Sequence, residues 1–165
     1  RASGVREEDC IDLLRRAGCS AGVIAHCRAV RDLALTYASD PLIDRGLVEA
    51  GALLHDIGRG VTHDIRHAEV GGEICRSFGL DEEVIAIVER HIGAGLTADE
   101  CSLLNLLPRD CMPRTAEEKI VAHADNLVKG TRVITLDERL LYAIALPERQ
   151  RRRIYRLGVE VELFR

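Results

Sequence analysis

The stretch of sequence that decides the fold is LVEAGALLHDIGRG, residues 47–60. Its first eight residues are mostly apolar and lead directly into the dipeptide His55-Asp56, after which Gly58 and Gly60 end the run. An apolar segment of this kind followed by glycines is typical of a buried helix and its C-terminal end. A histidine and an aspartate in such a place need a partner. A metal ion bound by both side chains would provide one.

Further imidazoles and carboxylates elsewhere in the chain fit the same idea. The candidate metal ligands are His26, His55, Asp56, His67, His91 and Asp125. They fall on separate expected helices, which is how helical bundles build metal sites in their cores. All the donor atoms are nitrogen or oxygen, a set that suits iron, manganese, zinc, nickel or cobalt. We therefore predict a pair of divalent metal ions, with Asp56 as the carboxylate that bridges them.

Each of these residues taken alone has an ordinary structural explanation. A single helical histidine is more often a core or surface residue than a ligand, and a single aspartate is more often a helix cap or an ion-pair partner. Asp125 changes that balance, because it lies within the apolar segment 120–128 and far from the expected cap at Thr115. A carboxylate in the middle of an apolar helix needs a partner or a cation.

Two histidines compete for one position in this set. His63 precedes His67 by four residues, so both could share a helix face if the helix starts early. We favour His67 because Gly71 and Gly72 follow it and allow close helix packing, but His63 remains an alternative. His123 lies two positions before Asp125 and should point elsewhere on the helix, so we interpret it as structural.

Helical periodicity runs through almost the entire chain. Only residues 132–136 have strand character, and no linker divides the sequence. We expect one all-α domain over residues 1–165, a bundle of eight to nine helices around the metal site. The expected helices cover about residues 6–17, 20–39, 44–57, 66–78, 82–92, 97–107, 115–129, 137–145 and 147–164.

Composition limits the partners and the compartment. Hydrophobic residues make up 47% and charged residues 30% of the chain, as in ordinary globular proteins. No apolar stretch approaches the roughly 20 residues needed to cross a bilayer, and residues 1–8 lack the apolar core of a signal peptide. We therefore expect a cytoplasmic protein without a membrane partner, in which an oligomer is possible. The six cysteines form no Cys-x-x-Cys pair. Free thiols are the default expectation, and a disulfide between one pair is an alternative if the protein comes from a hyperthermophile.

The formal net charge of −4 argues against binding to long nucleic acid, which relies on a basic surface. The basic run at residues 149–153 is expected to be a solvated helix face. A small phosphorylated substrate remains compatible with this charge, because metal ions would supply the local positive potential.

The order His26, His55-Asp56, Asp125 resembles the H…HD…D signature of the HD-domain superfamily of metal-dependent phosphohydrolases. The flanking segments 26–30, 53–58 and 124–125 fit it too, and segment 67–71 with His91 is similar to the two-metal branch that includes symmetric diadenosine-tetraphosphate hydrolase. The resemblance implies a helical HD core over about residues 22–132, followed by C-terminal helices at about 137–164.

The resemblance also implies roles for individual residues. The first ion would be bound by His26, His55, Asp56 and Asp125, and the second by Asp56, His67 and His91. Three residues after the HD aspartate, where this superfamily often has a phosphate-binding lysine, the chain has Arg59. The Pro and Arg that usually follow the last aspartate in the diadenosine-tetraphosphate hydrolase branch are replaced here by the sequence NLVKGTR, residues 126–132.

The leading functional hypothesis is hydrolysis of a phosphoester or phosphoanhydride in a small, nucleotide-like substrate by a metal-activated water, with Asp56 and Arg59 as catalytic residues. Two alternatives use the same ligands. One is a diiron oxygenase of HD fold that acts on a small molecule, and the other is a regulatory module that binds metal or nucleotide without turnover. Oxygen consumption would identify the first alternative, and a nucleotide complex that never turns over would identify the second.

Overall fold

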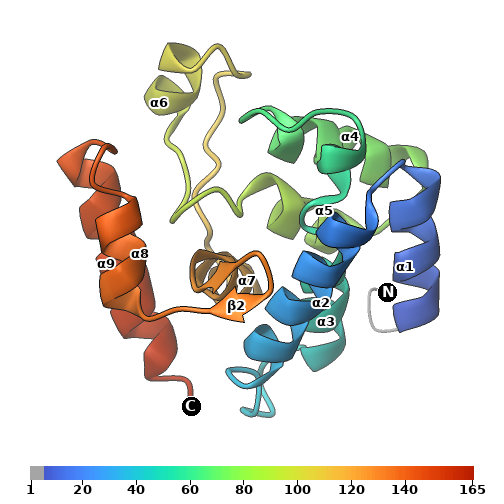
Figure 1. The fold of residues 1–165 in the computed structure, drawn as a ribbon, viewed down its shortest axis with the longest axis horizontal. Coiled ribbons are helices and arrows are strands. Elements are labelled where there is room, and N and C mark those ends of the chain that lie inside the picture. The colour runs from blue at the N-terminus through green and yellow to red at the C-terminus, as the bar shows by residue number, and fades with distance from the viewer. Residues whose placement is uncertain (1–5) are drawn as a thin grey trace.

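The computed structural model describes residues 6–165. The expectation that residues 1–8 form no signal peptide falls largely on residues 1–5, which lie outside the described part. Within residues 6–165 the chain forms nine α-helices, one short 3-10 helix (η2) and a two-stranded hairpin (Figure 1). The elements are α1 (Glu7–Arg16), α2 (Ala21–Leu35), α3 (Arg45–Leu54), η2 (Ile57–Gly60), α4 (His67–Ser77), α5 (Glu82–Glu89), α6 (Ala98–Leu103), α7 (Ala116–Asn126), β1 (Val128–Lys129), β2 (Arg132–Val133), α8 (Leu136–Tyr142) and α9 (Glu148–Glu162). The predicted all-α bundle is confirmed.

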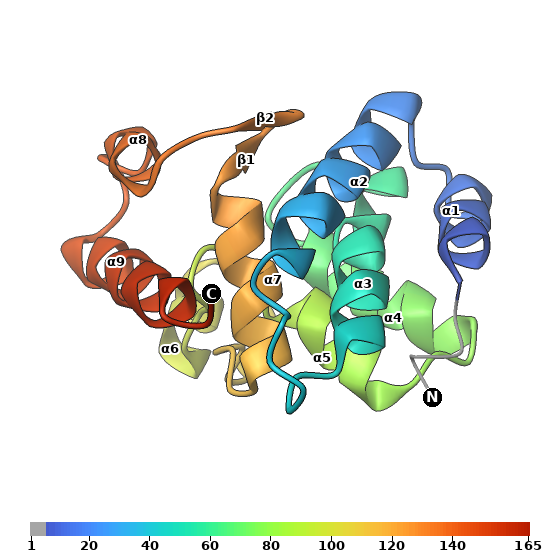
Figure 2. The same cartoon turned by 90° about the horizontal axis from the view of Figure 1, so that it is seen from below.

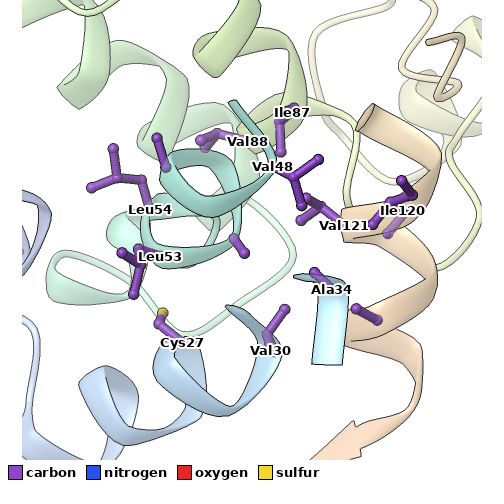
Figure 3. Packing of buried hydrophobic residues seen from close by; sticks show 14 of the residues in the cluster. Cys27, Val30, Ala34, Val48, Leu53, Leu54, Ile87, Val88, Ile120 and Val121 are labelled. Carbon is purple, nitrogen blue, oxygen red and sulfur yellow. The ribbon is translucent and has the colours of Figure 1, made fainter. Parts of the chain in front are cut away.

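Helix α3 is the centre of the bundle and packs against α1, α2, α5 and α7. Figure 3 shows the resulting core, in which Val30 of α2, Val48 of α3, Val88 of α5 and Val121 of α7 are all fully buried. Each such side chain contributes roughly 1.5–3 kcal/mol by leaving water. Gly51 allows α3 and α5 to approach closely, because a Cβ at this position would lie 2.5 Å from Cδ1 of Ile87.

The helix starts follow the capping residues in the sequence. The side chains of Ser20, Asp44, Thr97 and Thr115 each accept a hydrogen bond from a backbone N–H in the first turn of the helix that follows. Thr97 forms a complete capping box with Glu100. Such caps stabilise a helix by about 1 kcal/mol and fix where it begins.

Several helices end earlier than predicted. Helix α3 ends at Leu54 rather than near Ile57, because the backbone leaves the helical conformation at Asp56 (φ −102°, ψ 17°) before η2 begins. Helix α7 ends at Asn126 rather than Lys129, since the chain turns into the β1–β2 hairpin through Gly130, which has a φ of +64°. The expected strand at 132–136 is reduced to β2.

Helix α9 packs on α7 and α8 packs on α9, and both lie on the side of the bundle opposite α1 (Figure 2). Glu162 anchors α9, because its Oε2 accepts hydrogen bonds from the Tyr37 hydroxyl at 2.5 Å and from His123 Nε2 at 3.1 Å. His123 therefore has the structural role that we predicted. Among residues 6–165, no helix combines the length and the apolar character that a membrane span requires.

The basic run at residues 149–153 is not simply a solvated face. The Arg153 guanidinium is mostly buried and pairs with Glu100 at 2.5 Å, and Arg151 donates a hydrogen bond to the carbonyl oxygen of Leu146. These arginines hold α9 against neighbouring segments, which the charge pattern alone did not indicate.

Candidate metal centre

The fold brings together side chains from five separate regions of the chain. Their positions are His26 in the middle of α2, His55 and Asp56 at the end of α3, His67 at the start of α4, His91 just after α5, and Asp125 near the end of α7. His55, Asp56, His67 and His91 are buried, and His26 and Asp125 are partly exposed. The centre therefore lies at the helix ends, with one open side.

Asp56 stands in the middle of the cluster, and its two oxygens face different histidines. Oδ1 lies 3.3 Å from Nε2 of His67 and 3.3 Å from Nε2 of His91. Oδ2 lies 3.6 Å from Nε2 of His26 and 3.6 Å from Nε2 of His55. Each oxygen thus shares a small space with two imidazole nitrogens, which is the arrangement that a carboxylate bridging two ions requires.

Asp125 completes the first of these two groups. Its Oδ1 lies 2.9 Å from Nε2 of His26 and 3.2 Å from Nε2 of His55. The donor atoms of these three residues all lie within 4.8 Å of one another, as do those of His55, Asp56 and His91. The Nε2 atoms of His67 and His91 are 3.1 Å apart in the second group.

Four backbone carbonyls fix the orientation of the four imidazoles. The Nδ1 atoms of His26, His55, His67 and His91 lie 2.6–2.8 Å from the carbonyl oxygens of Gly130, Ala52, Asp64 and Val88, respectively. A carbonyl oxygen only accepts, so each Nδ1 carries a proton, and each Nε2 points into the centre, where it would present its lone pair to a bound cation. Orientation of this kind is typical of metal-binding histidines.

The donor set also fits a metal by size. Metal–nitrogen and metal–oxygen bonds of about 2.0–2.2 Å place neighbouring ligand atoms about 3–3.5 Å apart around a tetrahedral or octahedral ion. The distances of 2.9–3.6 Å from the two aspartates to the four imidazoles match that range. We conclude that this cluster could hold divalent metal.

The pKa shifts within the cluster favour the ionised form of Asp56. Burial alone would raise the pKa of Asp56, but the neighbouring imidazoles of His55, His67 and His91 hold the pKa well below its usual value. Burial lowers the pKa of His91. At His55 the same effect is outweighed by Asp56 and Asp125, which raise the pKa of His55 well above its usual value. Asp56 is therefore an anionic carboxylate ready to bind cations.

Local backbone packing positions Asp56 relative to the second group. Gly58 of η2 lies directly on the first turn of α4, where a Cβ would collide with the carbonyl oxygen of His67 and lie 2.8 Å from the backbone nitrogen of Gly71. This contact sets the distance between Asp56 and His67. Arg59 lies one residue further, with Nε 3.2 Å from Oδ2 of Asp56.

The structure distinguishes the two histidines that the sequence left open. His67 is buried in the cluster, whereas His63 is exposed in the loop before α4, where its backbone carbonyl accepts a hydrogen bond from Arg59. Helix α4 begins only at His67, so the two residues do not share a helix face.

Sequence reasoning missed two residues beside the centre. Asn126 is buried next to Asp125, and its Oδ1 accepts a hydrogen bond from Nε of Arg139 at 3.1 Å. Asn126 had a signal, since it is a second polar residue in an apolar helix. Arg139 had none, because only the packing of α8 brings it to this position. Lys129, in contrast, is exposed, and its ammonium lies 4.0 Å from the ring centroid of Tyr142.

Comparison with known proteins identifies the family. Residues 23–130 match the sequence profile of the HD domain. The chain belongs to the HD domain family. Members of this family are typically metal-dependent phosphohydrolases. The match includes every residue of the cluster and ends before α8.

Relatives of this HD domain protein include the uncharacterized protein MJ0778 of Methanocaldococcus jannaschii, 50% identical over 125 residues that cover 73% of this chain and 74% of the relative. A tRNA (cytidine(56)-2'-O)-methyltransferase of Thermoplasma volcanium is 47% identical over 132 residues, 80% of this chain. The match spans only 39% of that methyltransferase.

One solved structure has a similar fold. The HD domain of the Listeria monocytogenes phosphodiesterase PgpH, crystallised in complex with cyclic-di-AMP, superposes with a TM-score of 0.57 over 90% of this chain and 94% of its own. The sequence identity is 15%, so the likeness concerns the fold alone.

Proposed function

We propose that this HD domain protein is a two-metal phosphohydrolase that cleaves a phosphoester or phosphoanhydride bond in a nucleotide-like substrate. The observation that carries the proposal is the position of Asp56, whose two oxygens each face a separate pair of oriented histidines. A single-metal site would not need imidazoles on both sides of one carboxylate.

The residues divide into two ligand sets that share Asp56. His26, His55 and Asp125 would hold one ion together with Oδ2 of Asp56, and His67 and His91 would hold the other together with Oδ1. When bound, such a pair of ions lowers the pKa of a coordinated water and stabilises negative charge on a phosphate. The second set has fewer protein ligands, which leaves it more room for water and substrate oxygens.

Arg59 would act on the substrate phosphate. Its guanidinium lies beside Asp56 and is about one-third exposed, at 31%, so it can reach both the carboxylate and a ligand that enters from the open side. An arginine can donate two parallel hydrogen bonds to phosphate oxygens and stabilise the charge that develops there.

The names of several relatives support this chemistry. PgpH is a phosphodiesterase, and Ribonuclease Y of Acidothermus cellulolyticus is 39% identical over 71 residues, 42% of this chain and 14% of the relative. The finer assignment, to the branch that resembles symmetric diadenosine-tetraphosphate hydrolase, is also a proposal. Diadenosine tetraphosphate therefore belongs in the substrate screen.

The same nitrogen and oxygen ligands would serve a diiron oxygenase. The cation of Arg59 beside the centre favours a phosphate substrate over an uncharged one. Protein purified without added metal should be analysed for metal and then incubated anaerobically with nucleotides and dinucleotides, with all products, nucleotides as well as inorganic phosphate, separated by chromatography. Hydrolysis without oxygen is expected. Oxygen-dependent turnover, or no hydrolysis product from any of these compounds with fully loaded protein, would overturn the proposal.

A pair of variants tests the bridging residue. Asp56→Asn should abolish turnover and reduce the metal bound per chain, because the amide cannot bridge two cations. Asp12→Asn is the matched control, since Asp12 is an exposed residue of α1 whose carboxylate pairs with Arg16, on a helix that carries none of the ligands. Retained turnover in the Asp56 variant would remove the bridge from the mechanism.

A further inference from the structure

A cavity of about 600 Å³ lies between segment 92–96, which directly follows His91, helix α6 and the junction of α8 and α9. Its walls are mostly apolar and include Ile65, Ile92, Leu96, Leu103, Leu146 and Ile154. Cavities that bind small molecules typically have volumes of about 300–1,000 Å³, apolar walls and a few fixed polar groups. In Figure 1, α6 projects from the bundle on the side where α8 and α9 lie.

Arg139 of α8 connects this cavity to the metal centre. It lines the cavity, and its Nε donates a hydrogen bond to Oδ1 of Asn126. The Nδ2 of Asn126 donates in turn to the carbonyl oxygen of Gly93 at 3.0 Å. Asn126 is the residue next to Asp125. The guanidinium is thus held in a fixed place between the ligands of the first ion and the cavity wall.

The rest of the Arg139 guanidinium has no protein partner. Within residues 6–165, no hydrogen-bond acceptor and no carboxylate within ion-pair distance meets its two Nη atoms. Burial lowers the pKa of Arg139, and the carboxylate of Asp125 partly offsets this effect. A partly buried cation with no carboxylate in direct contact is costly, so an anion at this place would stabilise it.

We propose that the phosphate of the substrate binds to Arg139 and that its organic group, a nucleoside, fills the apolar cavity. This inference rests on the proposed hydrolase function and names the part of the molecule that selects the substrate. Arg139 and the α8–α9 junction lie beyond residues 23–130, where the family match ends. The cation and one wall of this subsite therefore come from a part of the chain beyond the HD domain match, and the facing wall, with Ile65, Ile92 and Leu103, lies within it.

A nucleoside fits the cavity by size and by polarity. The apolar walls would cover the faces of a base, and Gln150 at the wall carries a side-chain amide that can donate and accept hydrogen bonds with a base edge. Within residues 6–165, no hydrogen bond to the Gln150 side-chain amide is formed. Inorganic phosphate alone would leave the apolar walls uncovered.

The chain contains no tryptophan, which permits a direct optical test of the cavity. Leu103→Trp places a single indole in the cavity wall, and Leu141→Trp places one on the exposed outer face of α8, where Leu141 is 71% exposed. The probe is the methylene phosphonate analogue of AMP, which cannot be hydrolysed at the replaced oxygen. Titration of metal-loaded protein should change the emission of the Leu103→Trp variant saturably and leave that of the Leu141→Trp variant unchanged.

A second pair of variants tests the phosphate end. Arg139→Gln should raise the dissociation constant of the analogue at least about tenfold, the loss expected for a charge-assisted hydrogen bond. Arg156→Gln, an exposed arginine on α9, should leave it unchanged. Methylphosphonate, which lacks the nucleoside, should bind more weakly than the analogue. Circular dichroism of each variant establishes that it is folded.

The outcomes separate this inference from the proposed hydrolase function. Turnover of nucleotides, with no change in emission from the Leu103→Trp variant and an unaffected Arg139→Gln variant, would overturn the cavity assignment and leave the hydrolase intact. Equal affinity for methylphosphonate and the nucleoside analogue would also overturn it. Saturable binding of the analogue to the Leu103→Trp variant, without hydrolysis of any nucleotide or dinucleotide, would support the cavity and refute the hydrolase.

Discussion

Replacing Gly58 with alanine is expected to displace one side of the metal centre while the protein stays folded. The added Cβ would meet backbone atoms of His67 and Gly71, and backbone cannot rotate away as a side chain can. The Cβ would lie 2.8 Å from the Gly71 nitrogen and closer still to the carbonyl oxygen of His67, so η2 and α4 must separate by about 1.5 Å to reach ordinary van der Waals contact.

That displacement strains the fold locally and is far larger than a metal site tolerates. Overpacking of this kind costs about 1–3 kcal/mol, less than the roughly 5–15 kcal/mol by which domains are typically stable. Metal–ligand distances, in contrast, tolerate deviations of only about 0.2 Å. We therefore expect Gly58→Ala to bind about one ion fewer per chain, because His67 moves away from Asp56.

The assay combines urea unfolding with elemental analysis of the dialysed protein. Gly22→Ala is the matched control, because Gly22 is exposed within α2 and a Cβ there would meet only Oγ of Ser20, at 3.8 Å. Gly22 lies in the first turn of α2, so this change should raise the free energy of unfolding by at most about 0.5–1 kcal/mol, the gain in a helix interior, and leave the metal content unchanged. If the Gly58 variant matches wild type in both stability and metal content, the contact between η2 and α4 does not position the ligands.

Three further predictions concern single side chains. His67→Ala should lower the metal content and abolish turnover, whereas His63→Ala should change neither, since His63 is exposed; equal losses in an elemental analysis would contradict the assignment. Cys27→Ala should retain most activity, because no thiol nucleophile is needed, and a phosphate-release assay that shows inactive but folded protein would refute this. Burial raises the pKa of Cys10 to about 12, so iodoacetamide at about pH 8, below the ordinary thiol pKa, should label it only in denaturant, which mass spectrometry can check.

Much of the fold follows from local features of the sequence. Periodic apolar residues predict helices because about 3.6 residues per turn place them on one face, and caps such as Ser20 and Thr97 fix where helices start. The predicted ends of the helices were less accurate than their starts. The break at Asp56 and the hairpin after Asn126 depend on contacts with distant segments. The periodic sequence pattern therefore continues past the residue at which each helix ends.

The candidate site was likewise predictable from the sequence in part and from the packing of the helices in part. The sequence by itself determined which residue types were available, since polar side chains such as Asp125 in apolar helices require a buried partner wherever they pack. Only the tertiary structure decided that both oxygens of Asp56 face histidines, that His67 rather than His63 lies in the cluster, and that Arg139 borders it. The local sequence pattern indicates which residues are buried and which face of a helix they share. Distances between residues far apart in the chain are fixed only when the helices pack against one another.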